Sequence, residues 1–298
     1  MFGRHKSISA FGEILWDIYP DKKRLGGAPF NFIYHIWKIV GKANFISSVG
    51  RDSYGEEILA KLNSMDFDTS RIIVDEEHPT GTVLVELDKN KVPRFTPTCN
   101  CCYDFLKLSD KLTSKLFSET DILYFGTFSS RSEITRNTLV SLFNQPKLKY
   151  FCDLNLRHSF YSKELVEQAL FTSNVVKMND EELDKLREMF HLPQTDEDAC
   201  KVLLNNFRIE LIGLTLGENG AYLFSHDESN YYKPMRAEII DTLGAGDAFA
   251  AILCLGYLTE MPLSKTNQYA NEFALEVCKV NGALPDESAY SKYISLFR

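Results

Sequence analysis

The stretch DTLGAGDAFAAILCLGYL, from Asp241 to Leu258, joins a glycine-rich turn to an apolar run that predicts a buried helix. Gly244 and Gly246 can adopt backbone conformations that turn successive N–H groups toward one point. The start of the helix adds unpaired N–H groups and the positive end of its dipole. The sequence therefore predicts a site for an anionic oxygen, beside an Asp247 carboxylate whose ionised form the helix field favours. Taken alone, the same residues also fit a tight turn with an aspartate that caps the helix.

Around this stretch, strand-like and helical runs alternate. The first strand-like run begins at Ile8, and we expect it to extend to Tyr19. Further strand-like runs lie at 122–127, 150–155, 175–179 and 211–217. This alternation predicts an α/β fold with a mostly parallel central sheet flanked by helices. Ligands of such sheets bind where the parallel strands end, so the loops after these runs are candidate site segments.

Residues 80–98 follow a different pattern. TGTVLVELD alternates as a strand, DKNK at 88–91 reads as a turn, and VPRFTPT resumes extended structure. Hairpins of this kind often cover a ligand. We expect a single domain over residues 1–298, with a small β lid contributed by roughly 17–26 and 72–104.

Composition excludes several classes of partner. The chain has 298 residues and a net charge of −8, with Lys and Arg spread along it, which argues against nucleic acid and anionic membranes. No apolar run approaches the roughly 18 residues that span a bilayer, and the N-terminus lacks the features of a secretory signal. The seven cysteines are an odd number and predict reduced thiols in a cytoplasmic protein. Cys99, Cys101 and Cys102 lack the CxxC spacing and fourth ligand that zinc requires.

The glycine-rich stretch resembles the C-terminal signature of the ribokinase-like (PfkB-type) carbohydrate kinases, DTxGAGD followed by small and apolar residues. The resemblance implies that Asp247 is the base that activates the acceptor hydroxyl, and that Gly244, Ala245 and Gly246 form an anion hole. Leu243 is the visible departure, at a position where the family commonly has Thr. The sequence contains no GxxxxGK[ST] and no GxGxxG, which excludes a P-loop kinase and disfavours a dinucleotide-dependent dehydrogenase.

A second resemblance lies at LGGAPFN, residues 25–31, and precedes GAGD in the order typical of the family. It implies that Gly26 and Gly27 let the backbone approach a sugar and that Asn31 binds its hydroxyls. Asp17, in GEILWD, matches a strand aspartate that contacts sugar hydroxyls. On the expected lid, Phe95 would meet the sugar. By themselves, the two glycines are also an ordinary turn before a helix, and Asp17 a solvated carboxylate.

Further matches imply where ATP and its ions bind. Arg157, in DLNLR, would pair with substrate or with phosphoryl charge, and Glu182, in NDEE, would reach Mg²⁺ through water. Asp241 would lie beside a monovalent cation, K⁺ in many family members. The other residues implied to contact ATP are Lys177, Asn179, Thr215, Gly217, Gly220 and Asn271. Alone, NDEE is a plain helix start and TLGENG, at 215–220, a hairpin.

The substrate follows only from resemblance. GEILWD, GGAPFN, YDFL, YFGT and DLNLRHSFYS together look most like bacterial fructokinases, which implies ATP-dependent conversion of fructose to fructose 6-phosphate. Ribose, 2-keto-3-deoxygluconate and nucleosides such as adenosine stay open as acceptors, and the bulky Phe30 could alter the pocket. A non-catalytic sugar- or nucleotide-binding protein is the alternative from another class. Its weakness is that a binding protein needs no catalytic base. A homodimer formed through the lid is a further expectation.

Overall fold

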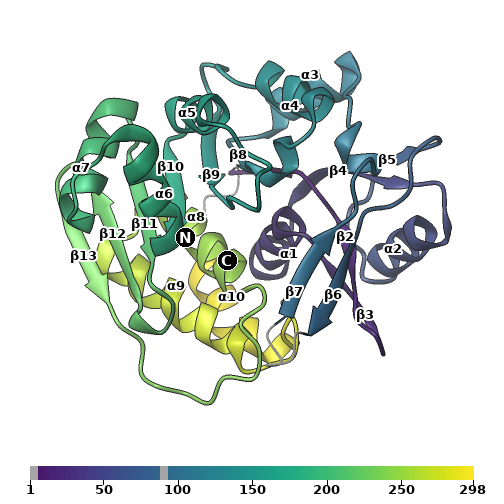
Figure 1. Cartoon of the computed structure of the whole chain (residues 1–298). Coiled ribbons are helices and arrows are strands. Elements are labelled where there is room, and N and C mark those ends of the chain that lie inside the picture. The colour runs from purple at the N-terminus through teal and green to yellow at the C-terminus, as the bar shows by residue number, and fades with distance from the viewer. Residues whose placement is uncertain (1–5, 88–92) are drawn as a thin grey trace.

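The computed structural model describes residues 6–87 and 93–298. Within them, a nine-stranded sheet has the order β13-β12-β11-β10-β9-β8-β1-β4-β5 (Figure 1). Its strands are β1 (Ile8–Phe11), β4 (Asn44–Gly50), β5 (Ile72–Asp75), β8 (Ile122–Gly126), β9 (Lys149–Asp153), β10 (Val175–Asn179), β11 (Leu211–Thr215), β12 (Ala221–Ser225) and β13 (Ser229–Tyr232). Neighbouring strands from β11 to β5 are parallel, and β12 and β13 are antiparallel. The predicted α/β fold with a mostly parallel sheet is confirmed.

Helices cover both faces of this sheet (Figure 1). They are α1 (Ala28–Val40), α2 (Ser53–Ser64), α3 (Asp110–Glu119), α4 (Glu133–Ser141), α5 (Lys163–Thr172), α6 (Asp180–Phe190), α7 (Asp196–Phe207), α8 (Ala245–Leu258), α9 (Leu263–Cys278) and α10 (Ser291–Phe297). Alternate residues of each strand serve the two faces: Tyr124 packs into the core with α1, α8 and α9, while Leu123 and Phe125 pack into the core with α3 to α7.

The predicted first strand is two strands in two sheets. β1 ends at Phe11, and β2 (Leu15–Ile18) joins a second sheet instead. Gly12 lies at the break with a φ of +149°, and a Cβ there would lie 2.3 Å from the hydroxyl oxygen of Ser129. A glycine is therefore required where the chain leaves the large sheet.

The second sheet, hereafter the small sheet, has the order β3-β2-β6-β7. Its other strands are β3 (Lys23–Gly26), β6 (Thr82–Leu87) and β7 (Pro93–Pro97), and β6 and β7 form the predicted antiparallel hairpin. The predicted turn at 88–91 lies outside the described residues. β5, which we assigned to the lid, pairs with β4 in the large sheet. Leu15, Val83 and Phe95 of the small sheet pack against Tyr103 and Phe128 of the main body, so one face is apolar and covered.

No helix within the described parts of the chain combines the length and the apolar character that a membrane crossing needs.

Candidate active site

The glycine-rich turn lies at the start of α8, as predicted. Gly244 precedes the helix with a φ of +79°, and a Cβ there would lie 2.3 Å from the Cβ of Ala283. Only glycine fits this conformation and this close approach. A Cβ on Gly246 would lie 3.0 Å from the Nζ of Lys177, so that position carries the backbone directly over a buried ammonium. The N–H of Ala245 already donates to the carbonyl of Thr242, at 3.3 Å.

Asp247 lies in the first turn of α8 and meets a residue from the other end of the chain. The Nδ2 of Asn31, on α1, donates to Oδ2 of Asp247 over 2.8 Å, although the two residues are 216 positions apart. Asn31 is buried, and its Oδ1 has no hydrogen-bond partner among the described residues. A buried acceptor without a donor suits a ligand hydroxyl. The two glycine motifs of the sequence therefore meet in one site.

The surroundings of Asp247 raise its pKa. Burial is the main cause and the nearby carboxylate of Asp153 adds to it, while Asn31, Lys177 and Arg157 act in the opposite direction. Together they raise the pKa of Asp247 from 3.8 to about 7. Burial thus outweighs the helix field, which by itself favours the ionised carboxylate. A carboxylate that titrates near neutral pH is well suited to take a proton from a hydroxyl.

A buried ion pair lies under the turn. The Nζ of Lys177, on β10, is 3.0 and 3.1 Å from the two carboxylate oxygens of Asp153, at the end of β9. Tyr124 donates its hydroxyl to the same carboxylate over 3.2 Å. Burial alone would lower the pKa of Lys177, but Asp153, Glu182 and Asp247 outweigh it, so the pKa is raised and the ammonium stays charged. This fixed positive charge lies next to Gly246, where phosphoryl oxygens are expected.

Glu182 fixes the loop after β9. Its Oε1 accepts from the N–H of Leu156 and its Oε2 from the N–H of Asn179, each over 2.9 Å. The N–H of Glu182 donates to Oδ1 of Asn179 in return, which completes a capping box at the start of α6. Both oxygens of this buried carboxylate therefore already accept one backbone hydrogen bond.

The candidate sugar-binding residues form a tight backbone corner. A Cβ on Gly26 would lie 2.5 Å from Oδ2 of Asp17, and one on Gly27, where φ is +109°, would lie 2.5 Å from the carbonyl oxygen of Glu13. Asp17 is buried, and burial raises its pKa to about 7 despite the nearby Arg24. The glycines thus let the chain pass directly beside a buried carboxylate.

Phe95 and Phe30, the two aromatic residues expected near the sugar, differ in how deeply they are buried. Phe95 is half-buried, on the face of the small sheet that packs against the main body. Phe30, which the sequence suggested could alter the pocket, is fully buried against Tyr34, Phe45 and Phe67. Its bulk fills the core beside α1 and leaves the site unchanged.

The remaining candidate residues lie around this centre. Arg157 is exposed, and its Nε donates to Oδ1 of Asn155 over 2.7 Å. Thr215 ends β11, and Gly217 and Gly220 adopt positive φ in the turn to β12. Asn271 is buried in α9, where its Nδ2 donates to the backbone and side-chain oxygens of Asn267. Its hydrogen bonds thus lie within the helix.

Asp241 is engaged by groups of this chain. Its Oδ2 accepts from Nη1 of Arg24 and from the N–H of Gly282, each over 2.9 Å, and its Oδ1 accepts from the N–H of Leu243 over 3.1 Å. A monovalent cation here would face a guanidinium, and two like charges about 4 Å apart near a protein surface repel by about 4 kcal/mol. The residues present therefore do not fit the K⁺ site that the resemblance implied.

Asp153, Tyr124 and Arg24 contact one another or candidate site residues, although the sequence did not single them out. Asp153 had a usable signal, because it ends a buried strand at the edge where ligands bind. Tyr124 lies within an apolar strand, and Arg24 lies on a strand of four residues. Neither differs in sequence from an ordinary structural residue.

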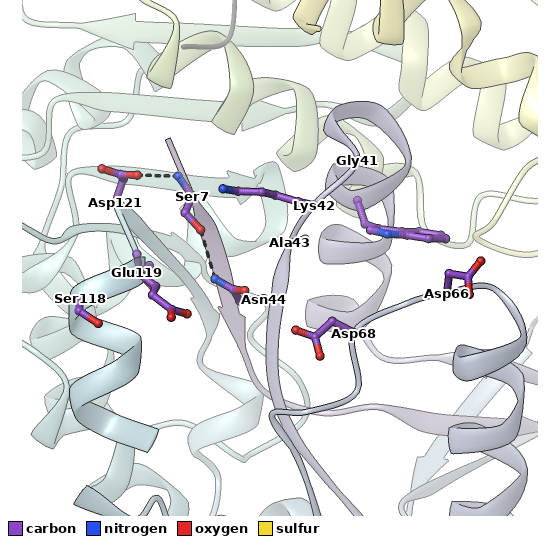
Figure 2. A pocket seen from close by; sticks show the side chains of 12 residues that line it. Ser7, Gly41, Lys42, Ala43, Asn44, Asp66, Asp68, Ser118, Glu119 and Asp121 are labelled. Atoms are coloured by element: carbon purple, nitrogen blue, oxygen red, sulfur yellow. Dashed lines mark hydrogen bonds between the residues drawn. The ribbon is translucent and has the colours of Figure 1, made fainter. Parts of the chain in front are cut away.

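A hollow of about 510 Å³ lies away from these residues, at the end of the large sheet where its parallel strands begin (Figure 2). Ser7, Asn44 and Asp121, which line it, stand at the starts of β1, β4 and β8, and Figure 2 shows Ser7 bonded to the other two. Candidate residues such as Asp153 and Asn179 stand where strands end. This hollow is therefore separate from the candidate active site.

Comparisons with known proteins show which proteins this chain resembles. A fructokinase of Salmonella typhimurium is 26% identical over 93% of this chain and 92% of its own. The crystal structure of a sugar kinase from Pyrococcus horikoshii is 25% identical, covers 98% of this chain and 99% of its own, and has a TM-score of 0.83. A Vibrio cholerae fructokinase, solved with fructose, ADP and a potassium ion bound, has a TM-score of 0.79 at 23% identity, over 98% of each chain. The family model described as pfkB family carbohydrate kinase matches residues 17–289, and the chain belongs to this family.

Proposed function

We propose that this ATP-dependent sugar kinase phosphorylates fructose to fructose 6-phosphate, with Asp247 as the general base. The observation that carries the proposal is the pair formed by Asp247 and Asn31, which joins a carboxylate that titrates near pH 7 to a buried amide with an open acceptor. A sugar hydroxyl placed between them could donate its proton to the carboxylate. The attacked phosphoryl group would then lie at the start of α8.

The proposed reaction uses charges that are already in place. Asp247 takes the proton as the hydroxyl oxygen bonds to the γ-phosphorus, and the bond to the bridging oxygen of ADP breaks. The N–H groups of Gly244 and Gly246 and the ammonium of Lys177 stabilise the phosphoryl oxygens. Arg157, exposed beside the site, supplies a further positive charge.

Mg²⁺ would enter with the phosphates of ATP and neutralise part of their charge. The carboxylates of Asp153 and Glu182 flank Lys177 and offer the oxygen donors that this ion prefers, usually one or two together with phosphates and water. Because the oxygens of Glu182 each already accept a backbone N–H, its contact with the metal would run through water.

The remaining ATP contacts are proposed along the edge where β10 and β11 end. Asn179 and Thr215 close these two strands, and Gly217 and Gly220 shape the turn that follows. Asn271 would border the base of the nucleotide from α9.

On the other side of the acceptor, the small sheet would act as a lid. Asp17, Gly26 and Gly27 would bind the sugar from β2 and β3, and Phe95 would cover it from β7. Such a lid excludes the water that competes as phosphoryl acceptor. Pairing of two chains through the outer face of the small sheet is the matching proposal for a dimer.

The experiment is an ADP-release assay with Mg²⁺-ATP over fructose, glucose, ribose, 2-keto-3-deoxygluconate and adenosine. Fructose should give the largest kcat/KM, in keeping with the fructokinases among the relatives. A clear preference for another acceptor would overturn the assignment of fructose and leave the kinase standing. Release of ADP with none of a wider sugar panel, together with sugar binding by calorimetry, would favour the binding protein.

A further inference from the structure

An arginine of the small sheet reaches the turn that leads into α8. The guanidinium of Arg24, on β3, lies 2.9 Å from Oδ2 of Asp241 through Nη1 and 3.4 Å from Oδ1 of Asn281 through Nη2. Its Cδ lies 3.3 Å from where a Cβ on Gly282 would be, so the stem rests on that backbone. The side chains of Arg24 and Asp241 are only 18% and 25% exposed, which shields the pair from solvent.

This ion pair lies at the junction of three segments. The N–H groups of Ile240 and Asp241 donate to the carbonyl of Cys278, and the N–H of Gly282 donates to the Asp241 carboxylate. Gly244, the first residue of the predicted anion hole, approaches Ala283 in the same loop. Asp241 thus holds residues 278–283 against the turn, and Arg24 supplies the positive charge that balances this carboxylate.

We propose that Arg24 is a positioning residue that does the work of a monovalent cation, so that phosphoryl transfer by this enzyme does not require K⁺. The guanidinium neutralises Asp241 and fixes the turn that presents its N–H groups to the phosphoryl oxygens. It is covalently part of the small sheet, so the charge is present whatever the salt. The inference rests on the proposed role of the Gly244–Gly246 turn in binding phosphoryl oxygens.

The first test uses the native protein. Rates of ADP release with fructose are compared in KCl, NaCl and tetramethylammonium chloride at equal ionic strength. We expect the three values of kcat to agree within about twofold. Activation of about tenfold or more by K⁺ over tetramethylammonium would overturn the inference, because a factor of that size means that the ion stabilises the transition state.

The second test removes the charge. Arg24→Ala should lower kcat about tenfold or more, since a displaced turn misplaces the donors for the phosphoryl group. K⁺ or low concentrations of guanidinium chloride should restore it, because a free cation can then bind Asp241. Lys22→Ala, in the exposed turn of the same hairpin, is the matched control and should respond to neither ion. An Arg24→Ala variant with native kcat in tetramethylammonium chloride would contradict the inference.

A third measurement needs no turnover. The melting temperature of Arg24→Ala should rise in KCl relative to tetramethylammonium chloride, and that of the native protein should not. The response should disappear in the Arg24→Ala, Asp241→Asn double variant. If no acceptor gives ADP but the melting temperatures behave in this way, the proposed reaction fails and the cation replacement stands. An equal K⁺ response in native protein and variant would show that Arg24 replaces no ion.

Discussion

Replacing Asp247 by asparagine should abolish turnover and at the same time stabilise the folded protein at alkaline pH. Asparagine keeps the size of the side chain, and its oxygen can still accept the hydrogen bond from Asn31, which spans 2.8 Å. The variant loses the carboxylate that takes the proton of the acceptor hydroxyl. A general base contributes roughly 10²- to 10⁴-fold, so kcat should fall at least about 100-fold while sugar and ATP still bind.

The gain in stability follows from the raised pKa of Asp247. Because its pKa is about 7 in the folded protein and 3.8 in its ordinary state, the folded state holds the proton more tightly than the unfolded chain. The ionised group therefore lowers the stability increasingly as the pH rises from about 4 to about 7, and by a constant amount above that range. About three pKa units at 1.36 kcal/mol each set an upper limit of about 4 kcal/mol. Partial exposure of the side chain reduces the expected gain to about 2 kcal/mol.

Two assays check these expectations. Coupled ADP release gives kcat. Urea unfolding at about pH 8 and about pH 4 gives the free energy of unfolding, and the variant should differ from the native protein only at the higher pH. Asp110→Asn, which changes an exposed aspartate in the first turn of α3, is the control and should alter neither quantity appreciably. Retention of more than about a tenth of the native kcat would show that Asp247 is not the base. Equal free energies of unfolding for the native protein and Asp247→Asn at about pH 8 would show that burial does not raise the pKa of Asp247.

Three further outcomes are expected. The kcat/KM should fall about tenfold per pH unit below about pH 7 as Asp247 takes up a proton, and a flat profile between about pH 5 and 8 would contradict the pKa of about 7. Glu182→Gln should lower the free energy of unfolding in urea by about 1–3 kcal/mol, because the new amide group would face a backbone N–H. The exposed Glu181→Gln should change this free energy hardly at all. A shift in the Mg²⁺ dependence of activity in Glu182→Gln would support the contact with the metal. Phe95→Ala should raise KM for the sugar and ADP release without sugar, and an unchanged KM would remove Phe95 from the acceptor site.

The sequence predicted the large sheet well because its strands are buried on both faces. Runs such as 122–127 and 175–179 are apolar enough to be recognised without knowledge of their neighbours. The break after Phe11 and the pairing of β5 with β4 could not be predicted, since both depend on which strands lie side by side.

For the site too, features with a local signal could be predicted from the sequence, and contacts between distant segments could not. Asp247, Gly244 and Gly246 were found because helix starts and glycine turns carry local signals in the sequence. Family resemblance implied that Asn31 and Asp247 both act on sugar hydroxyls, but the hydrogen bond between them could not be predicted, because no local pattern links residues so far apart. The pairing of Arg24 with Asp241 and the burial of Phe30 are tertiary contacts, which no local pattern in the sequence predicts.

The bond between Asn31 and Asp247 also has a consequence for folding. Its two partners come from helices that lie near opposite ends of the chain, and α1 packs directly against α8. Loop closure over such a separation makes this contact slow to form, and a nascent chain cannot form it until α8 has been synthesised. Until then, the buried apolar residues of α1 lack the helix that covers them. Kinase activity should therefore appear only in the final phase of refolding, and a chain that ends before α8 should aggregate.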